Sequence, residues 1–258
     1  MVANYESWRA ARLAELGSPD SWLGLTGLYW LEAGDNRVGS GDDCLVRLPG
    51  GPAHLGDLRW AGNELWWQPL GGEMHRLASD RDGTPTVVEF ENWAFFPVDR
   101  EGRIAIRVRD RQWAAKQPFP GIDCFGYDPA WVFDADWQPL SPPQTMTVPN
   151  VTGEMKVVEV RHRAVFRVGD IEVELLPMSV GEQEVFFVFR DRTSGRETYG
   201  AGRFLKAPPP CDEHIRLDFN LAYNPPCAFT PFATCPLPPP ENWLAFPVPA
   251  GEKKWQGK

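Results

Sequence analysis

The distribution of proline places the strongest constraint on what this chain can fold into. Proline makes up 26 of 258 residues, about twice the average usage. The prolines crowd the last fifth, at 208–210, 225–226 and from 236 to 240. Because proline fixes φ and lacks an N–H donor, these segments cannot form helix or central strand. Aromatic and apolar residues stand among them, including Phe219, Tyr223, Phe229, Phe232, Leu237 and Trp243. We therefore expect an ordered, packed loop with irregular backbone.

The rest of the sequence has the pattern of one helix followed by short strands. Residues 3–16 place Tyr5, Trp8, Arg12 and Leu16 near one stripe, and Gly17 and Pro19 follow as stop signals, which predicts an N-terminal helix. After it come β-like runs separated by turn residues, at 22–31, 44–48, 55–60, 65–69, 86–90, 103–109, 157–168, 171–176, 184–190, 197–205, 215–219 and 244–248. Gly169-Asp170 predicts a two-residue hairpin turn between two of them.

This order of elements predicts an all-β, mainly antiparallel fold with one N-terminal helix. We expect the helix within residues 1–20, a small β-sandwich-like unit at 21–95, and a larger antiparallel sheet or barrel at 96–258. The Pro-rich C-terminal loop would close one mouth of the larger unit. Alternatively, the two β units form one continuous domain.

The charge balance excludes some partners. The formal net charge is -9, and no stretch of five Lys or Arg occurs, so neither nucleic acid nor an anionic membrane surface is an expected partner. The first residues have no basic and apolar segments of a signal peptide, and no run of eighteen apolar residues occurs; we expect a cytoplasmic protein with mostly reduced cysteines. The oligomeric state is not predicted.

Common catalytic motifs are missing from the sequence. It has no Walker loop, Rossmann fingerprint, His-Glu-x-x-His or Gly-x-Ser-x-Gly, which argues against the common nucleotide-binding, metalloprotease and hydrolase classes. No cofactor is predicted, and no catalytic residue is assigned.

Polar residues gather between Asp191 and Cys235, where we expect a site. Two glycines between Tyr199 and Arg203 indicate a bulge or the close approach of a ligand. In a regular strand these two side chains would share one face and suit an anionic ligand. The alternative is a buried Arg–Asp pair with the tyrosine packed over it.

The neighbouring polar residues also have two interpretations. Asp218 ends an expected strand and is either a general base or cation-binding group, or the salt-bridge partner of Arg203. Asn220 and Asn224 either bind the ligand or satisfy backbone groups of irregular chain. For Asn224, which precedes a proline, the structural interpretation is favoured.

The cysteines offer a weak metal alternative. Cys211, His214, Cys227 and Cys235 can be written as a four-ligand zinc set, but Cys211 follows three prolines in a connector and the last spacing is long. A nucleophilic Cys227 would need a base, for which His214 is the nearby candidate. Buried structural thiols are favoured.

The order and spacing of these segments resemble the uncharacterised family called domain of unknown function 1684. The motifs are Asp191-Arg192-Thr193, residues 199–203, residues 218–229 and the run from Cys235 to Pro239. Residues 22–31 and 34–36 are also similar to the family, so the resemblance covers nearly the whole chain. It implies no activity, because the family has none assigned.

A second, faint similarity concerns the N-terminal half. Residues 34–39, 44–48, 53–56 and 63–65 resemble a forkhead-associated domain, a β-sandwich that binds phosphothreonine peptides. However, Ser40 stands where that family has its phosphate-contacting Arg, and the Ser-x-x-His turn is replaced by residues 51–54 (Gly-Pro-Ala-His). The resemblance therefore implies a sandwich shape rather than phosphopeptide binding.

Three functions remain as alternatives. The first is a small-molecule-binding protein, or an enzyme, for an anionic or polar metabolite in a Pro-walled pocket; its candidate residues are Asp191, Tyr199, Arg203, Asp218, Asn220, Asn224 and Cys227. The second is a protein-interaction module that uses the N-terminal sandwich around Arg37–Ser40 and His54. The third is a structural role only.

Overall fold

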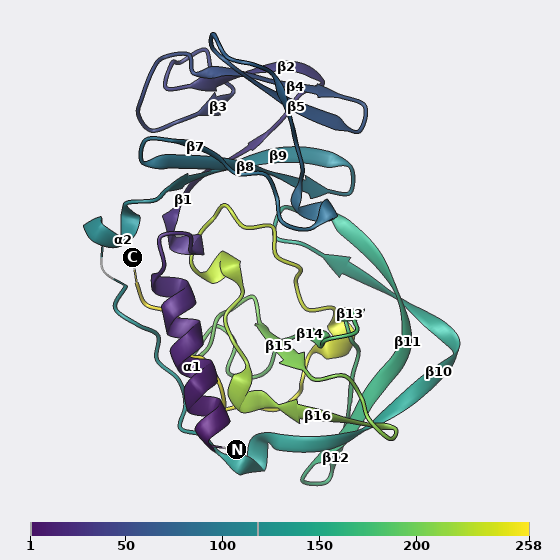
Figure 1. Ribbon diagram of the computed structural model, residues 1–258. Helices are drawn as coiled ribbons and strands as arrows, with labels where there is room; N and C mark the ends of the chain where they lie inside the picture. Colours follow the sequence, from purple (N-terminus) through teal and green to yellow (C-terminus); the bar gives the residue numbers. More distant parts are fainter. Residues whose placement is uncertain (1, 118, 258) are drawn as a thin grey trace. The chain divides into compact units, whose positions relative to one another are not determined.

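The computed structural model describes residues 2–117 and 119–257 (Figure 1). Residues 1, 118 and 258 lie outside the described residues. Residue 1 belongs to the predicted helical segment 1–20, and residues 118 and 258 belong to the predicted larger unit 96–258. The chain forms two compact units. We call residues 15–119 the sandwich unit, and the described residues up to 14 together with those from 120 onward the C-terminal unit. The boundary expected between residues 95 and 96 falls inside a strand, β8 (Trp93–Arg100).

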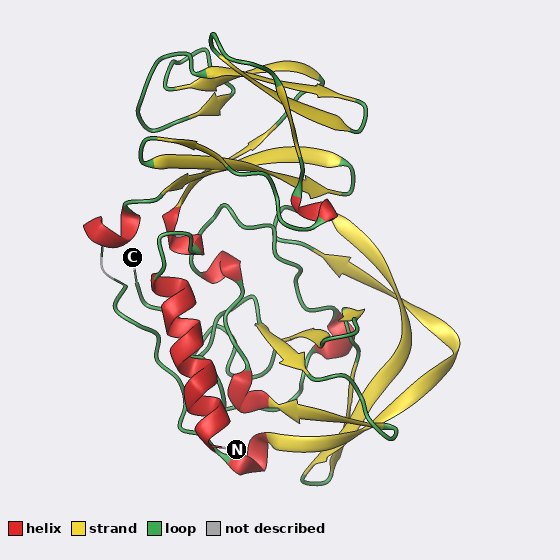
Figure 2. Cartoon of the chain, viewed as in Figure 1, coloured by secondary structure: helices red, strands yellow, loops and turns green. Residues whose placement is uncertain are grey.

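Antiparallel strands make up most of the regular structure (Figure 2). The long helix α1 (Val2–Gly17) begins the described chain and runs across the division between the units. The prediction of an all-β, mainly antiparallel fold with an N-terminal helix is confirmed. The other helices are short: α2 (Trp113–Lys116) and the 3-10 helices η1 (Trp22–Gly24), η2 (Asp80–Asp82), η3 (Pro129–Trp131), η4 (Phe219–Leu221), η5 (Pro226–Ala228) and η6 (Pro240–Asn242). In the described part of the chain, no helix has the length and apolar character needed to cross a membrane.

Two sheets form the sandwich unit. Their orders are β1-β9-β8-β7 and β3-β2-β4-β5-β6. Their strands are β1 (Leu25–Trp30), β2 (Gly34–Gly39), β3 (Val46–Arg47), β4 (Gly56–Ala61), β5 (Glu64–Pro69), β6 (His75–Leu77), β7 (Val88–Phe90), β8 and β9 (Arg103–Asp110). Phe95 and Ile106 of the first sheet belong to one buried cluster with Val38 and Trp67 of the second. The rings of Trp67 and Phe95 meet edge to face with centroids 5.1 Å apart. The sandwich expected from the sequence is therefore present.

Two further sheets form the C-terminal unit, with orders β12-β11-β10-β16 and β13-β14-β15. Neither sheet closes on itself, so the larger unit is not a barrel. Its strands are β10 (Val132–Pro149), β11 (Met155–Val168), β12 (Ile171–Leu175), β13 (Ser179–Val180), β14 (Val185–Phe189), β15 (Arg203–Ala207) and β16 (His214–Asp218). One buried cluster joins both sheets to the Pro-rich loop; its members include Phe166, Phe187, Leu205, Leu217 and Val248.

Phe219 stands at the centre of this core. Its side chain is fully buried, and its ring lies 5.3 Å from Phe189, 5.8 Å from Phe166 and 5.9 Å from Phe133, measured between centroids. The first residue of η4 thus supplies the aromatic contact between the two sheets and the loop.

After β16, the described part of the Pro-rich loop is packed and contains no strand. Asn242 is fully buried; its amide oxygen accepts the Leu176 N–H (2.8 Å), and its amide nitrogen donates to the carbonyls of Leu176 (2.8 Å) and Val188 (2.9 Å). The Asn242 side chain thus supplies hydrogen-bond partners for backbone groups, a role that prolines without an N–H cannot fill.

Two of the expected strands do not form as predicted. Of residues 197–205, only those from Arg203 onward are strand, because Gly202 has φ +95 and its N–H closes a turn on the Tyr199 carbonyl (3.1 Å). Residues 244–248 form no strand; they attach to the chain through Leu244 N–H to Arg190 O (2.8 Å). Pro247 and Pro249 interrupt any regular ladder there.

Candidate functional site

Arg203 and Asp191 form a fully buried ion pair. The guanidinium Nη2 lies 2.9 Å from Asp191 Oδ2, and both side chains have no exposed surface. The guanidinium also donates to the carbonyls of Val248 (2.9 Å) and Ala250. Burial lowers the pKa of Arg203 and the Asp191 carboxylate opposes this shift, so the group remains a cation. Arg203 thus forms the buried Arg–Asp pair that the sequence analysis gave as an alternative to a ligand site. Its partner is Asp191 rather than Asp218.

The second oxygen of Asp191 organises the turn that follows β14. Oδ1 accepts the N–H and hydroxyl of Thr193 (2.7 and 2.6 Å) and the N–H of Val248 (3.1 Å). The Thr193 hydroxyl also bonds that of Thr198 (2.8 Å). Both carboxylate oxygens of Asp191 are therefore bonded within the protein.

Tyr199 lies away from Arg203, beside two cysteines. Its hydroxyl donates to the carbonyl of Cys227 (3.0 Å), and the Cys227 N–H points at the sulfur of Cys235 (3.3 Å). Burial, together with the hydrogen bond to Cys227, raises the pKa of Tyr199, so the phenol stays protonated. The expected shared face of Tyr199 and Arg203 does not form, because the chain between them turns.

Asp218 and Asn220 stabilise the N-terminus of the 3-10 helix η4. Asp218 caps the helix by accepting the Asn220 N–H (3.1 Å). The Asn220 side chain is bonded to the backbone of Asp128, through N–H to Oδ1 (2.9 Å) and Nδ2 to the carbonyl (2.9 Å). Their contacts fit the structural interpretation.

Asn224 belongs to a buried polar cluster whose other members sequence reasoning missed. The Glu252 carboxylate accepts the Asn224 N–H (2.6 Å) and the Nε–H of Arg12 on α1 (3.0 Å). Asn224 Nδ2 donates to the Lys253 carbonyl (2.8 Å), while its Oδ1 has no hydrogen-bond partner. Sequence reasoning did not assign Glu252 a role, and Arg12 was noted only for its position on the helix stripe.

Glu252 gives the fold a specific pH dependence. Burial raises the pKa of Glu252, although Arg12 and the Asn224 N–H act in the opposite direction. A carboxyl whose pKa is higher in the folded state stabilises below its unfolded pKa, and this contribution is lost as pH rises through the folded value. Glu252→Gln cannot ionise. We therefore expect the free energy of unfolding of Glu252→Gln, minus that of the wild type, to increase from about pH 4 to about pH 8 in urea denaturation. A difference that is flat across this range would contradict the shift.

The structure does not bring the weak zinc set together. Among residues 2–117 and 119–257, no three or more His, Cys, Asp and Glu side chains gather in a way that could hold a metal ion. Cys211 and His214 face each other through a backbone bridge, with N–H to carbonyl distances of 2.8 and 2.9 Å. Cys227 and Cys235 form a separate pair.

A pocket of about 360 Å³ lies beside Asp191 in the C-terminal unit. It is lined by Arg190, Asp191, Arg192, Trp243, Leu244 and Ala245. The Arg190 guanidinium lies over the Trp243 ring, 4.9 Å from its centroid. Its lining contains no proline, and of the seven predicted ligand-binding residues it includes Asp191 alone.

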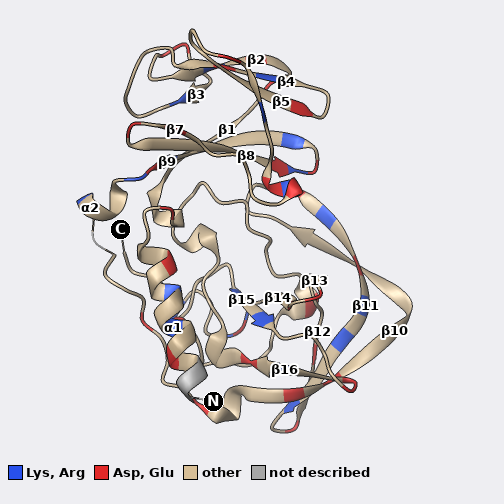
Figure 3. Cartoon of the chain, in the orientation of Figure 1, with Lys and Arg blue, Asp and Glu red and all other residues tan. Residues whose placement is uncertain are grey.

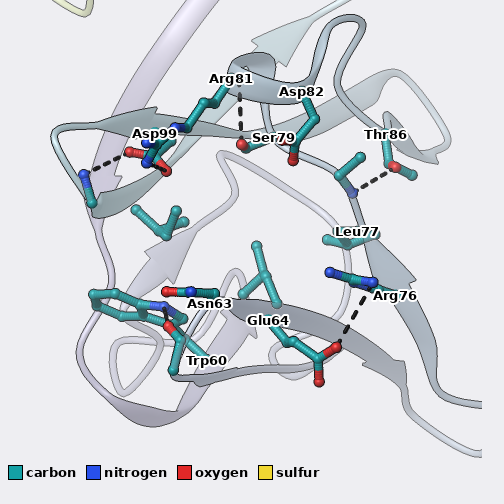
Figure 4. A pocket seen from close by; sticks show the side chains of 15 residues that line it. Trp60, Asn63, Glu64, Arg76, Leu77, Ser79, Arg81, Asp82, Thr86 and Asp99 are labelled. Atoms are coloured by element: carbon teal, nitrogen blue, oxygen red, sulfur yellow. Dashed lines mark hydrogen bonds and ion pairs between the residues drawn. The ribbon is translucent and has the colours of Figure 1, made fainter.

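A larger cleft of about 690 Å³ lies in the sandwich unit (Figure 4). One wall comes from the β4–β5 turn and β6, with Trp60, Asn63, Glu64 and Arg76; the other comes from the η2 segment and the β8–β9 end, with Ser79, Arg81, Asp82, Thr86 and Asp99. Leu65, Leu77 and Ile104 supply apolar surface. None of these residues was predicted to bind a ligand, although residues 63–65 belong to the segments that resemble a forkhead-associated domain.

The charges of the cleft are mixed. Arg76 lies 3.7 Å from Glu64, and Arg81 lies 3.5 Å from Asp99. Together with Asp82, the lining has three carboxylates and two guanidinium groups. Figure 3 shows the same interspersion of acidic and basic residues along both units.

The surface resembling a forkhead-associated domain is occupied by internal contacts. Arg37 pairs with Asp43, the Ser40 hydroxyl donates to the Gly51 carbonyl (2.8 Å), and His54 Nε2 lies 3.1 Å from Asp57. Carboxylates beside Arg37 and His54 oppose the binding of a phosphate at this surface.

Comparison with known proteins connects the chain to one family. The profile of the family described as "Protein of unknown function (DUF1684)" matches residues 117–253. This match covers the C-terminal motifs and leaves out the N-terminal segments 22–31 and 34–36. A solved structure with similarity is the solution NMR structure of an uncharacterized protein of Haloarcula marismortui; it is 29% identical, with 54% of this chain and 78% of that chain covered and a TM-score of 0.44. No curated protein matches the chain.

Proposed function

The chain belongs to the DUF1684 family of proteins of unknown function, and we propose that it is a small-molecule-binding protein that takes a neutral, polyhydroxylated metabolite in the cleft of its sandwich unit. The observation that carries this proposal is the cleft itself. Its volume of about 690 Å³ lies in the range of metabolite sites, about 300–1,000 Å³.

The lining favours hydrogen-bonding ligands without net charge. Carboxylates, guanidinium groups and an amide offer donors and acceptors in fixed planes, while Trp60 presents an aromatic wall. The hydroxyls of a sugar ring can bond to these polar groups, and its C–H face can pack against the Trp60 ring. An anion would have to displace the acidic partners of both arginines in a lining with an excess of carboxylates, so a phosphate or carboxylate ligand fits less well.

Calorimetry of the full chain with neutral mono- and disaccharides tests this proposal. Asn63 is exposed on the β4–β5 turn, and Asn63→Ala should weaken binding about fivefold to tenfold. Trp60→Ala should weaken it at least about tenfold. Asn92→Ala, on the exposed turn between β7 and β8, is the matched control and should bind as the wild type does. Absence of binding to the wild type at millimolar saccharide, or equal binding by Asn63→Ala and Asn92→Ala, would refute the proposal.

A second candidate site is the pocket beside Asp191, for an anionic metabolite. The observation in its favour is that Arg190 and Arg192 flank it, while the Asp191 carboxylate is already bonded to Arg203 and Thr193. Citrate and inorganic phosphate serve as the probes. Binding of either that is lost in Arg192→Ala and unchanged in Asn63→Ala assigns the ligand to this pocket instead of the cleft.

A further inference from the structure

Two thiols lie together in the Pro-rich loop. Cys227 is on η5, and Cys235 is eight residues after Cys227, in the following loop. The Cys227 backbone N–H lies 3.3 Å from the Cys235 sulfur and donates a hydrogen bond to it. Neither residue forms a disulfide. The Cys235 thiol therefore lies directly against the backbone of Cys227.

The surroundings of the pair have the features of a reactive thiol. Cys227 is only half-buried, whereas Cys235 is buried. The neighbouring Cys235 thiol lowers the pKa of Cys227, and burial opposes this shift. A lowered pKa increases the thiolate fraction, and the thiolate is the nucleophile.

The backbone around the pair is anchored. The Cys235 carbonyl accepts the Val151 N–H (3.0 Å), and the Leu237 N–H donates to the Pro149 carbonyl (2.7 Å). The Cys227 carbonyl accepts the Tyr199 hydroxyl (3.0 Å). These bonds keep the two cysteines in proximity, so a disulfide forms without ordering a mobile segment.

We propose that Cys227 and Cys235 form a redox-active dithiol, with Cys227 as the attacking thiol and Cys235 as the resolving thiol, whose substrate is a small-molecule disulfide. The Cys227 thiolate attacks one sulfur of RSSR, the S–S bond breaks, and one RS⁻ leaves with a mixed disulfide on Cys227. Cys235 then loses its proton and attacks the Cys227 sulfur, which releases the second RS⁻. Both leaving groups take up a proton. RSSR is reduced to two RSH, and the two protein thiols are oxidised to one disulfide.

Oxidised glutathione is the probe, applied to the full, previously reduced chain. Peptide mapping should find a Cys227–Cys235 disulfide and a loss of the mass of two hydrogen atoms, and dithiothreitol should reverse it. Cys211 is exposed, and it serves as the reference for accessible thiols. Modification of Cys211 with Cys227 and Cys235 both unmodified would overturn the proposal.

Three variants assign the roles. Cys235→Ser should stop the reaction at a stable glutathione adduct on Cys227. In Cys227→Ser, the buried Cys235 should stay unmodified. Tyr199→Phe retains the ring but loses the hydroxyl, and should slow disulfide formation several-fold without lowering its final yield. Faster adduct formation on Cys235 than on Cys227 would contradict the assignment, as would an unchanged rate in Tyr199→Phe with native circular dichroism.

Discussion

Arg203→Met is expected to lower the free energy of unfolding by about 3–5 kcal/mol. Methionine fills much of the same space but leaves the Asp191 carboxylate in the interior without its counter-ion. The carbonyls of Val248 and Ala250 also lose their donor. Because domains have only about 5–15 kcal/mol of stability, we expect a large decrease in the urea midpoint of the C-terminal unit, measured by circular dichroism.

A double-mutant cycle separates the ion pair from the packing. Asp191→Leu alone leaves a buried cation and should also be strongly destabilising, whereas Arg203→Met/Asp191→Leu removes both charges. The double variant should therefore lose less stability than the sum of the single losses, by about 0.5–3 kcal/mol. Additive losses would mean that the two charges do not interact.

Phe219→Ala is expected to destabilise the C-terminal unit by about 3–5 kcal/mol. The truncation leaves a cavity between Phe133, Phe166 and Phe189, whose rings now contact Phe219. Phe219→Leu retains most of the volume and should cost less than half as much. Thermal and urea denaturation of both variants measures the effect; equal losses for Ala and Leu would show that the cavity is not its cause.

The sequence predicted well the elements whose pattern is local. The hairpin of β11 and β12 followed from alternating residues around Gly169-Asp170, and in the structure Val168 pairs with Ile171 across that turn. Gly169 has φ +59, which only a glycine adopts without cost. Turn chemistry and side-chain period agree at this site, so no tertiary information was required.

Strand β10 was missed because its prolines argue against a strand. Its 18 residues include Pro139, Pro142 and Pro143. The structure places the last two where the register with β11 shifts, between Pro139 and Gln144. A proline is tolerated where the ladder is interrupted. The compensating irregularity lies in the pairing of two strands, which the sequence of one strand does not show.

For the candidate site, the sequence identified polar residues but not their partners. Arg203 and Asp191 were both singled out, yet the expected partner of Arg203 was Asp218, which instead caps η4. The partner depends on how the turn at Thr193–Thr198 folds back. No sequence motif predicted the sandwich cleft as a binding site, because the cleft is assembled from side chains of distant segments.

The ion pair between Arg12 and Glu252 joins residues 240 positions apart, and this has a consequence for folding during synthesis. The sandwich unit is one continuous segment, so it can fold while later residues are still being translated. The C-terminal unit begins with α1 but needs Val248–Glu252 to bond Arg203 and Arg12. We therefore expect α1 to lack these partners until the whole sandwich unit and the last residues have been synthesised. During that interval chaperones can bind the helix.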